Sequence, residues 1–147
     1  MASSDAKRLL LDVNALLALA WPNHQFHGGV IRRLERRPAP DWATCALTQL
    51  GFVRLSSNPA VVGIPRNPGQ ALDILARITA DQRHAYFDGL PPLSSADPFF
   101  RPLVGHQQVT DAYLVAVAAA HGAKLLTLDQ RLGFTASTRD HVEVLAP

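Results

Sequence analysis

Cysteine is nearly absent from this chain. The 147 residues include one cysteine, Cys45, so the chain cannot form an internal disulfide and no thiolate zinc site is indicated. Because Cys45 lies in an apolar run, we expect it to be buried as a small hydrophobic side chain. The N-terminus lacks the apolar core of a signal peptide, and no apolar run approaches the roughly 18 residues that span a bilayer. These absences predict a cytoplasmic protein that does not enter a membrane.

An excess of one charge is also lacking. Lysine and arginine number 14 against 12 acidic residues, which gives a formal net charge of +2. This balance is compatible with a nucleic-acid partner but does not require one. With 48% hydrophobic and 18% charged residues, the composition is that of a folded globular chain. The length predicts a single domain over residues 1–147.

Helix and strand patterns alternate along the chain, which predicts an α/β fold with a mostly parallel sheet. The expected strands are residues 8–12, 41–45 and 124–129, with a weak strand near 86–87 and an edge strand at 142–145. The expected helices are residues 14–20, 24–37, 47–56, 69–79 and 108–121. Residues 58–68 read as a loop, and residues 85–101 have no clear pattern beyond the weak strand.

Two of the expected helices carry apolar residues that we predict to face the core. In helix 47–56 these are Leu47, Leu50 and Val53, with Phe52 as a further candidate. In helix 69–79 they are Ala71, Leu72, Leu75 and Ile78.

Two buried strands end in aspartate, at Asp12 and Asp129. Ligands of open α/β sheets bind outside the carboxyl ends of the strands, so both carboxylates are expected at the edge where chemistry takes place. Asp111 begins the long helix that precedes the second strand, and it joins them if the preceding loop returns to that edge. Three carboxylates in one patch raise at least one pKa unless a divalent cation compensates. Oxygen ligands of this kind favour Mg²⁺ or Mn²⁺ over zinc.

Each aspartate also has a purely structural interpretation. An aspartate that ends a strand is often a helix cap or a turn residue, and this applies to both Asp12 and Asp129. Asp111 is equally typical of an acid in the first turn of a helix, where it complements the helix dipole. It is the repeated pattern, and not any one residue, that indicates a functional site.

Four segments together resemble the PIN-domain ribonucleases, and in particular the VapC-type toxins of bacterial toxin–antitoxin pairs. The segments are Leu10-Leu11-Asp12-Val13-Asn14, Leu47-Thr48-Gln49-Leu50-Gly51-Phe52-Val53-Arg54, Gln108-Val109-Thr110-Asp111-Ala112-Tyr113-Leu114 and Leu126-Thr127-Leu128-Asp129. Each is unspecific alone, but they occur in the family's order and at similar spacing, and they cover essentially the whole chain.

The resemblance implies a three-layer α/β/α sandwich with a short, mostly parallel sheet. It also implies a Mg²⁺-dependent endoribonuclease, with Mn²⁺ able to substitute, that cuts structured or single-stranded RNA with a metal-activated water. On this reading Asp12, Asp111 and Asp129 form the metal site, and Asn14 supplies an amide that supports Asp12. The implied partners are RNA, a second copy of the chain, and an antitoxin that docks on the early helices and inserts a basic side chain into the acidic pocket.

Gln49 departs from the family pattern, because many members have glutamate at this position. We predict that Gln49 touches the acidic site or its metal-bound water, and that the missing charge weakens metal binding. Asp88 and Asp97 are possible replacements for that charge, whereas Glu35 belongs to a surface cluster.

Further residues are candidates for contact with RNA. Arg54 is placed to reach a phosphate or a site carboxylate, and His106 to lie near the scissile group. Thr127 is expected to hydrogen-bond within the acidic cluster, with a plain buried threonine as the alternative. Arg32, Arg33, Arg36 and Arg37 form a possible RNA track or a merely solvated helix face. Trp21 contributes either to a partner groove or to the core.

Two other functions stay open from the residues. One is a PIN-like domain that Gln49 has weakened catalytically and that binds RNA or a partner. The other is a haloacid-dehalogenase-type phosphatase with Asp12 as the nucleophile, although that chemistry calls for a second acid where this chain has Asn14, and for a lysine near the nucleophile.

Overall fold

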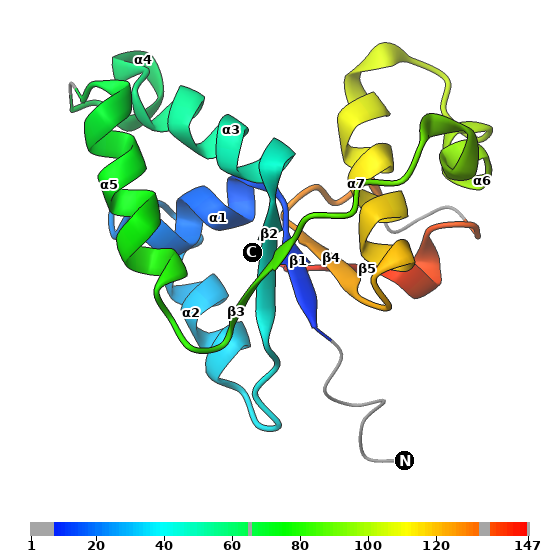
Figure 1. Cartoon of the computed structure of the whole chain (residues 1–147), viewed down its shortest axis with the longest axis horizontal. Coiled ribbons are helices and arrows are strands. Elements are labelled where there is room, and N and C mark those ends of the chain that lie inside the picture. The colour runs from blue at the N-terminus through cyan, green and yellow to red at the C-terminus, as the bar shows by residue number, and fades with distance from the viewer. Residues whose placement is uncertain (1–7, 65, 133–135, 147) are drawn as a thin grey trace.

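The computed structural model describes residues 8–64, 66–132 and 136–146. In this part of the chain five short strands form one sheet in the order β3-β2-β1-β4-β5, and every pair of neighbours is parallel (Figure 1). The strands are β1 Leu9–Leu11, β2 Trp42–Cys45, β3 His84–Phe87, β4 Lys124–Thr127 and β5 Val142–Val144. The helices are α1 Val13–Ala20, α2 His27–Glu35, α3 Ala46–Ser56, α4 Pro59–Val62, α5 Pro68–Thr79, α6 Asp97–Phe100 and α7 Val109–Ala120. Short 3-10 turns occupy Leu93–Ala96, His106–Gln108 and Arg139–His141.

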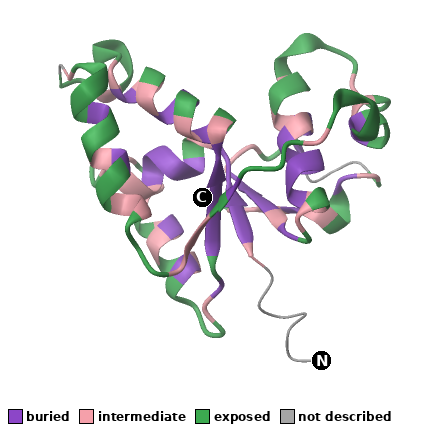
Figure 2. Ribbon diagram, in the orientation of Figure 1, coloured by how far each residue is buried: buried purple, intermediate pink, exposed green. Residues whose placement is uncertain are grey.

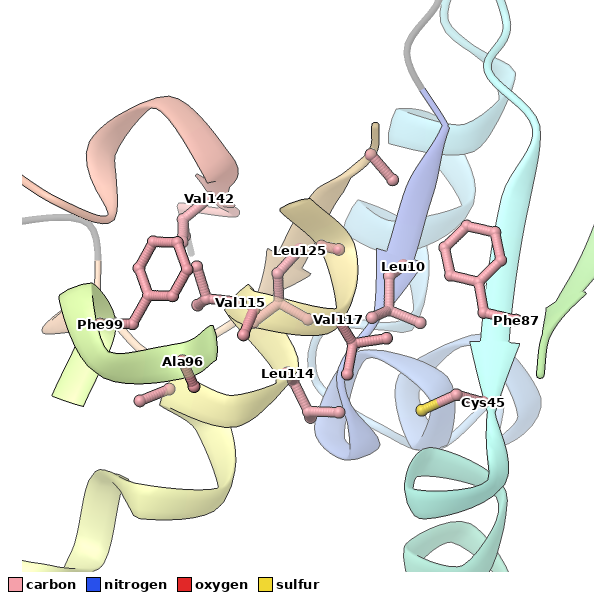
Figure 3. Packing of buried hydrophobic residues seen from close by; sticks show 14 of the residues in the cluster. Leu10, Cys45, Phe87, Ala96, Phe99, Leu114, Val115, Val117, Leu125 and Val142 are labelled. Carbon is pink, nitrogen blue, oxygen red and sulfur yellow. The ribbon is translucent and has the colours of Figure 1, made fainter. Parts of the chain in front are cut away.

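Helices cover both faces of the sheet, so the predicted three-layer sandwich is confirmed (Figure 1). Alternation along β1 sends Leu10 to one face and Leu9 and Leu11 to the other. Leu10 packs in the cluster shown in Figure 3, which α7 dominates and which contains the buried Cys45. The opposite cluster is built with α1, α2, α3 and α5. The central strands are therefore buried on both faces, as the apolar sequence around β1 indicates (Figure 2).

The connections bring the predicted acids to one edge of the sheet. β1 and β4 are direct neighbours, with Leu11 opposite Leu126, so Asp12 and Asp129 follow adjacent parallel strands. The turn His106–Gln108 leads into α7, which carries Asp111 in its first turn and ends at Ala120. After α7, Gly122 adopts a left-handed conformation (φ 64°), as expected for a residue that follows a helix.

The inward face of α3 differs from the prediction. Phe52 is fully buried, but Leu50 is 67% exposed and Leu47 also lies at the surface. The reason is a close approach of two helices at Gly51, where an added Cβ would lie 2.6 Å from Cγ2 of Val13 in α1. This contact turns the Gly51 face of α3 inward and leaves Leu47 and Leu50 outside.

Three other element predictions also need correction. In α5, Ala71 and Leu75 are buried but Leu72 is 56% exposed. α2 begins at His27 and not at residue 24, because the preceding residues form a loop in which the Phe26 N–H donates to His24 Nδ1. Helical turns at 59–62 and 93–100 occupy segments that had no helical pattern. Within the described residues no helix is long and apolar enough to cross a membrane.

Candidate active site

The three predicted carboxylates line one pocket of about 410 Å³ at the carboxyl edge of the sheet, and their predicted convergence is confirmed. Asp12 comes from the end of β1, Asp111 from the first turn of α7, and Asp129 from the turn after β4. The full lining is Asp12, Asn14, His24, Gln25, Phe26, Asp111, Leu128, Asp129 and Arg131.

The Asp12 residue is 4% exposed, and two hydrogen bonds fix its carboxylate. The Ala15 N–H donates to Oδ1 at 2.7 Å, which makes Asp12 the N-cap of α1. The Thr127 hydroxyl donates to Oδ2 at 2.5 Å from the neighbouring strand. The cap interpretation is therefore correct, and the cap also sets the direction of the carboxylate in the pocket.

Thr127 links two of the acids. Its hydroxyl donates to Asp12 and accepts a 3.0 Å hydrogen bond from the Asp129 N–H. The predicted hydrogen bond within the cluster is thus confirmed. The assignment of Thr127 as a substrate-binding residue is wrong, because its side chain is fully buried and no substrate can reach it.

The environments of the acids separate their pKa values. Burial raises the pKa of Asp12 to about 6, against the lowering by its two hydrogen bonds and with smaller additions from Asp111 and Asp129. Burial, with the Asp129 charge, also raises the pKa of Asp111. The hydrogen bonds from Arg131 lower the pKa of Asp129, which stays ionised. The pocket thus holds one secure negative charge and two acids whose charge is disfavoured by burial.

Arg131 is the main residue that the sequence interpretation missed. Its Nε donates to Asp129 Oδ1 at 3.0 Å and its NH2 to Oδ2 at 3.1 Å, so one carboxylate of the cluster is already paired. The Arg131 N–H also donates to Oδ1, which closes a tight turn. The signal was the spacing of two between an aspartate and an arginine in a turn, where a short side chain folds back on the following backbone.

Three further residues of the pocket, His24, Gln25 and Phe26, come from the loop before α2. His24 is half-buried, and its Nδ1 accepts the Phe26 N–H, so the neutral ring carries its proton on Nε2. Burial and the neighbouring His27 lower the pKa of His24. Phe26 adds an aromatic ring 6.1 Å from the His24 ring. His24 and Phe26 both fall in the helix predicted over residues 24–37, and nothing in the sequence pattern marks them as part of the pocket.

The structure does not bring Gln49 into the acidic pocket. Its Nε2 donates to Thr44 Oγ1 at 3.0 Å, and it lines a separate groove of about 520 Å³ between α3 and α5. Arg54 lines that same groove, away from the acids. Asn14 does line the acidic pocket, with an exposed side chain, but the hydrogen bonds that hold Asp12 come from Ala15 and Thr127. The predicted supporting role of Asn14 is therefore not seen.

His106 lies in an adjoining pocket of about 350 Å³. This second pocket is lined by Gly105, His106, Gln107, Gln108 and Arg131, and so it shares Arg131 with the acidic pocket.

The remaining candidates lie elsewhere. Arg33 of the basic cluster pairs with Glu143 on β5, which argues for a structural role. Asp97 pairs with Arg101 at 2.8 Å, and neither it nor Asp88 lines the acidic pocket. Trp21 is half-buried and donates from Nε1 to Ser56 Oγ at 3.0 Å, which joins α1 to α3.

The donor set fits a hard divalent cation that keeps part of its water shell. As the side chains stand, no three acidic, histidine or cysteine side chains among the described residues form a ready metal cage. Mg²⁺ needs only one or two direct carboxylates, with water in its other positions. Asp12 and Asp111 offer those oxygens, and Asp129 joins them if it leaves Arg131. The absence of cysteine from the pocket disfavours a structural zinc site.

Comparison with protein families gives a match to the PIN domain over residues 9–136. Ribonuclease VapC39 of Mycobacterium tuberculosis is 39% identical over 137 residues, which cover 92% of this chain and 98% of that protein. Ribonuclease VapC44 of the same species is 37% identical over 142 residues, which cover 94% of this chain and 99% of that protein.

Two solved structures share the fold. M. tuberculosis VapC20, described as a Sarcin-Ricin loop cleaving toxin, aligns with a TM-score of 0.60 at 18% identity, over 94% of this chain and 99% of that one. Rickettsia felis VapBC2, bound to a DNA fragment from its promoter, aligns with a TM-score of 0.63 at 12% identity, over 95% of this chain and 99% of that one.

Proposed function

Since the chain belongs to the PIN-domain family and is similar to VapC ribonucleases over nearly its whole length, we propose that it is a metal-dependent endoribonuclease and the toxin of a toxin–antitoxin pair. The observation that carries the proposal is the convergence of Asp12, Asp111 and Asp129 from three distant segments into one pocket. A carboxylate buried as deeply as Asp12 without a cationic side chain on it is costly unless its charge has a use.

The proposed cofactor is Mg²⁺, with Mn²⁺ as a substitute, held by Asp12 and Asp111 and completed by Asp129. When bound, such a cation would supply charge stabilisation at the scissile phosphate and make an attacking water more acidic. Oxygen-only ligands support this choice of metal. The pKa values raised by burial support it too, because a cation lying beside Asp12 and Asp111 reverses the penalty on their charges.

The side chains divide the remaining work. Thr127 and the Ala15 N–H hold the two oxygens of Asp12, so this carboxylate cannot rotate away from the pocket. We assign Asp111 to accept the proton of the attacking water, because its carboxylate lines the same pocket as Asp12 and Asp129 and projects from the first turn of α7. Hydrolysis in this manner leaves a 5′-phosphate and a 3′-hydroxyl. Phe26 offers a ring for stacking against an RNA base, and His24 offers an N–H donor.

The decisive experiment incubates the purified protein with mixed structured and single-stranded RNA and either Mg²⁺, Mn²⁺ or EDTA. We expect cutting that requires the metal and that falls by at least a hundredfold in Asp12→Asn. Asp97→Asn is the matched control, because Asp97 is a surface carboxylate outside the pocket, and it should cut like the wild type. If no RNA is cut in a metal-dependent manner, the proposed endoribonuclease activity is refuted. Equal cutting by Asp12→Asn would show that a contaminating nuclease is responsible.

A binding domain without activity is the second candidate, and it has a specific observation in its favour. Asp129 is paired with Arg131, so fewer charges are free for a metal than three unpaired carboxylates would offer. RNA binding without cutting in the same assay would select this candidate. A phosphatase has less support, since no lysine is found among the described residues that line the Asp12 pocket.

The proposed antitoxin docks in the groove between α3 and α5. Leu50, Leu72 and Tyr86 are large side chains that stay exposed there, beside the polar Gln49 and Arg54. Exposed apolar side chains gathered in a groove favour the apolar face of a partner helix. The expected antitoxin is the product of a small neighbouring gene, and its co-purification with this chain tests the pairing.

A homodimer is the proposed assembly of the free toxin. Light scattering on the eluting protein measures the mass directly, and a mass near twice the 15.9 kDa of one chain is expected.

A further inference from the structure

Arg131 occupies the boundary between two pockets. It lines the acidic pocket with Asp12, Asp111 and Asp129, and it also lines the adjoining pocket with His106 and the two glutamines that follow. The described residues that line the adjoining pocket include no carboxylate: they are Gly105, His106, Gln107, Gln108 and Arg131. Arg131 therefore lies between a pocket of carboxylates, which favours a cation, and a pocket of hydrogen-bond donors, which favours an anion.

The position of Arg131 in the free protein is held only weakly. Its two hydrogen bonds to Asp129 are well formed, but its side chain is 63% exposed. The Asp129 side chain is 19% exposed, so water reaches this pair mainly from the Arg131 side and screens the attraction there. A divalent cation at Asp129 or a phosphate near the guanidinium therefore competes easily with this contact.

RNA needs a positive group at this place. Three carboxylates repel a phosphodiester backbone, and Arg131 is the one arginine or lysine among the described residues that line the two pockets. A guanidinium matches the geometry of a phosphate with two parallel N–H donors. His106 and the amides of Gln107 and Gln108 offer further donors in the same pocket.

We propose that the pocket of His106, Gln108 and Arg131 is a binding subsite for an RNA phosphate next to the cleavage position, and that Arg131 reaches it by leaving Asp129 when a metal ion binds. This proposal rests on the nuclease function proposed above. It makes metal and RNA binding favour each other, since the metal frees the guanidinium that RNA requires. By linkage, RNA then raises metal affinity by the same factor.

The variant Arg131→Gln tests this, with Arg101→Gln as the matched control. Arg101 also pairs with an aspartate, Asp97, but it lies outside both pockets, so the control removes the same charge and the same kind of contact. Calorimetry on the RNA-free proteins measures Mn²⁺ affinity. Fluorescence anisotropy with a labelled RNA oligonucleotide measures RNA affinity in EDTA and in Ca²⁺, over a series of salt concentrations, and thermal melting verifies the fold.

We expect Arg131→Gln to bind Mn²⁺ roughly two- to fivefold more tightly, because Asp129 no longer has a competing partner, within the size of an exposed ion pair. Its RNA affinity in Ca²⁺ should fall about tenfold, the gain on adding Ca²⁺ should largely vanish, and the slope of log affinity against log salt should decrease by about one. Arg101→Gln should match the wild type.

Unchanged Mn²⁺ affinity in Arg131→Gln overturns the competition at Asp129, and unchanged RNA affinity overturns the subsite. An equal loss of RNA affinity in Arg101→Gln would show that the loss comes from the change in net charge, and it would also overturn the subsite. A wild-type protein that cuts no RNA contradicts the proposed function instead, and the Mn²⁺ measurement still decides whether Arg131 competes for Asp129.

Discussion

At the scale of single residues, the centre of the molecule is a carboxylate held in two directions. Asp12 caps a helix through one oxygen and accepts the Thr127 hydroxyl through the other. Because Asp12 follows a buried strand, the sequence predicted its place at the carboxyl edge of the sheet. The same pattern at Asp129 predicted that the two carboxylates lie at one edge. The contacts of Arg131 with Asp129 and of Gln49 with Thr44 could not be predicted from the sequence. Which side chains pair depends on rotamers and distances that the spacing of residues does not fix.

Burial of Asp12 gives a pH-dependent stability that Asp12→Asn removes. The pKa of Asp12 is about 6 in the folded protein and 3.8 as the ordinary value, so the folded state binds more protons than the unfolded state between these pH values. Stability from this group is therefore present at low pH and is lost as pH rises from about 4 to about 6. Two pH units correspond to about 3 kcal/mol.

In EDTA at pH 7.5 we expect Asp12→Asn to be more stable than the wild type by about 1–3 kcal/mol, and this advantage should shrink toward pH 4. Urea denaturation across this pH range measures it. The difference between the two proteins isolates Asp12 from the histidines, which titrate in both. If Asp12→Asn were less stable than the wild type at pH 7.5, the inference that the buried Asp12 charge destabilises the fold would be wrong.

Thr127→Val keeps the volume of the side chain and removes its hydroxyl. Because Asp12 Oδ2 and the Asp129 N–H both lose their partner, we expect a loss of about 1–3 kcal/mol of stability. The pKa of Asp12 should rise further, since the Thr127 bond lowers it. The pH profile of RNA cleavage should move to higher pH, with Thr127→Ser close to wild type; an unmoved profile would restrict Thr127 to a structural role.

At the scale of elements, periodicity located most strands and helices but not always their faces. α7 and β4 were predictable because they are apolar almost throughout, so any orientation buries them. α3 has apolar residues on several sides, and the face that turns inward is decided by the contact of Gly51 with Val13, two residues 38 positions apart. Such a contact has no trace in the local pattern.

Gly51→Ala tests this close approach. Alanine usually stabilises a helix relative to glycine by about 1 kcal/mol. Here the new methyl would lie 2.6 Å from Val13 Cγ2, so we expect a loss of about 1–3 kcal/mol instead. The double variant with Val13→Ala should recover part of it. Gly105→Ala, whose added Cβ meets nothing within 4 Å, is the control for denaturation experiments.

The exposed leucines of α3 and α5 are expected to serve a partner rather than the fold. Leu50→Glu places a charge in the groove at a side chain that is 67% exposed, so the melting temperature should change little. Affinity for the antitoxin should fall at least tenfold, measured by calorimetry. Leu93→Glu is matched in exposure at 65% but lies outside the groove, and equal weakening by it would argue against this surface.

At the scale of the whole molecule, the site joins the two helical layers. Asp12 begins α1, which packs on one face of the sheet, and Asp111 belongs to α7 on the other face. A cation held by both therefore stabilises the entire fold and not one segment.

Mn²⁺ should accordingly raise the melting temperature of the wild type. At a concentration 100 times its dissociation constant, a ligand that binds only the folded state adds about 2.7 kcal/mol. Asp111→Asn should lose most of this gain, while Asp97→Asn should retain it. Differential scanning fluorimetry provides the comparison, and an equal gain in all three proteins would place the cation elsewhere.

The position of β1 in the sheet has a consequence for the timing of synthesis. β1 is made first but lies between β2 and β4, and Thr127 and Asp129 leave the ribosome more than a hundred residues after Asp12. A growing chain therefore carries an unpaired central strand and an incomplete acidic cluster until β4 arrives. If the chain is the proposed nuclease, it would be unable to cut RNA until the segment that carries Thr127 and Asp129 has been made. A chain truncated before Lys124 should accordingly cut no RNA.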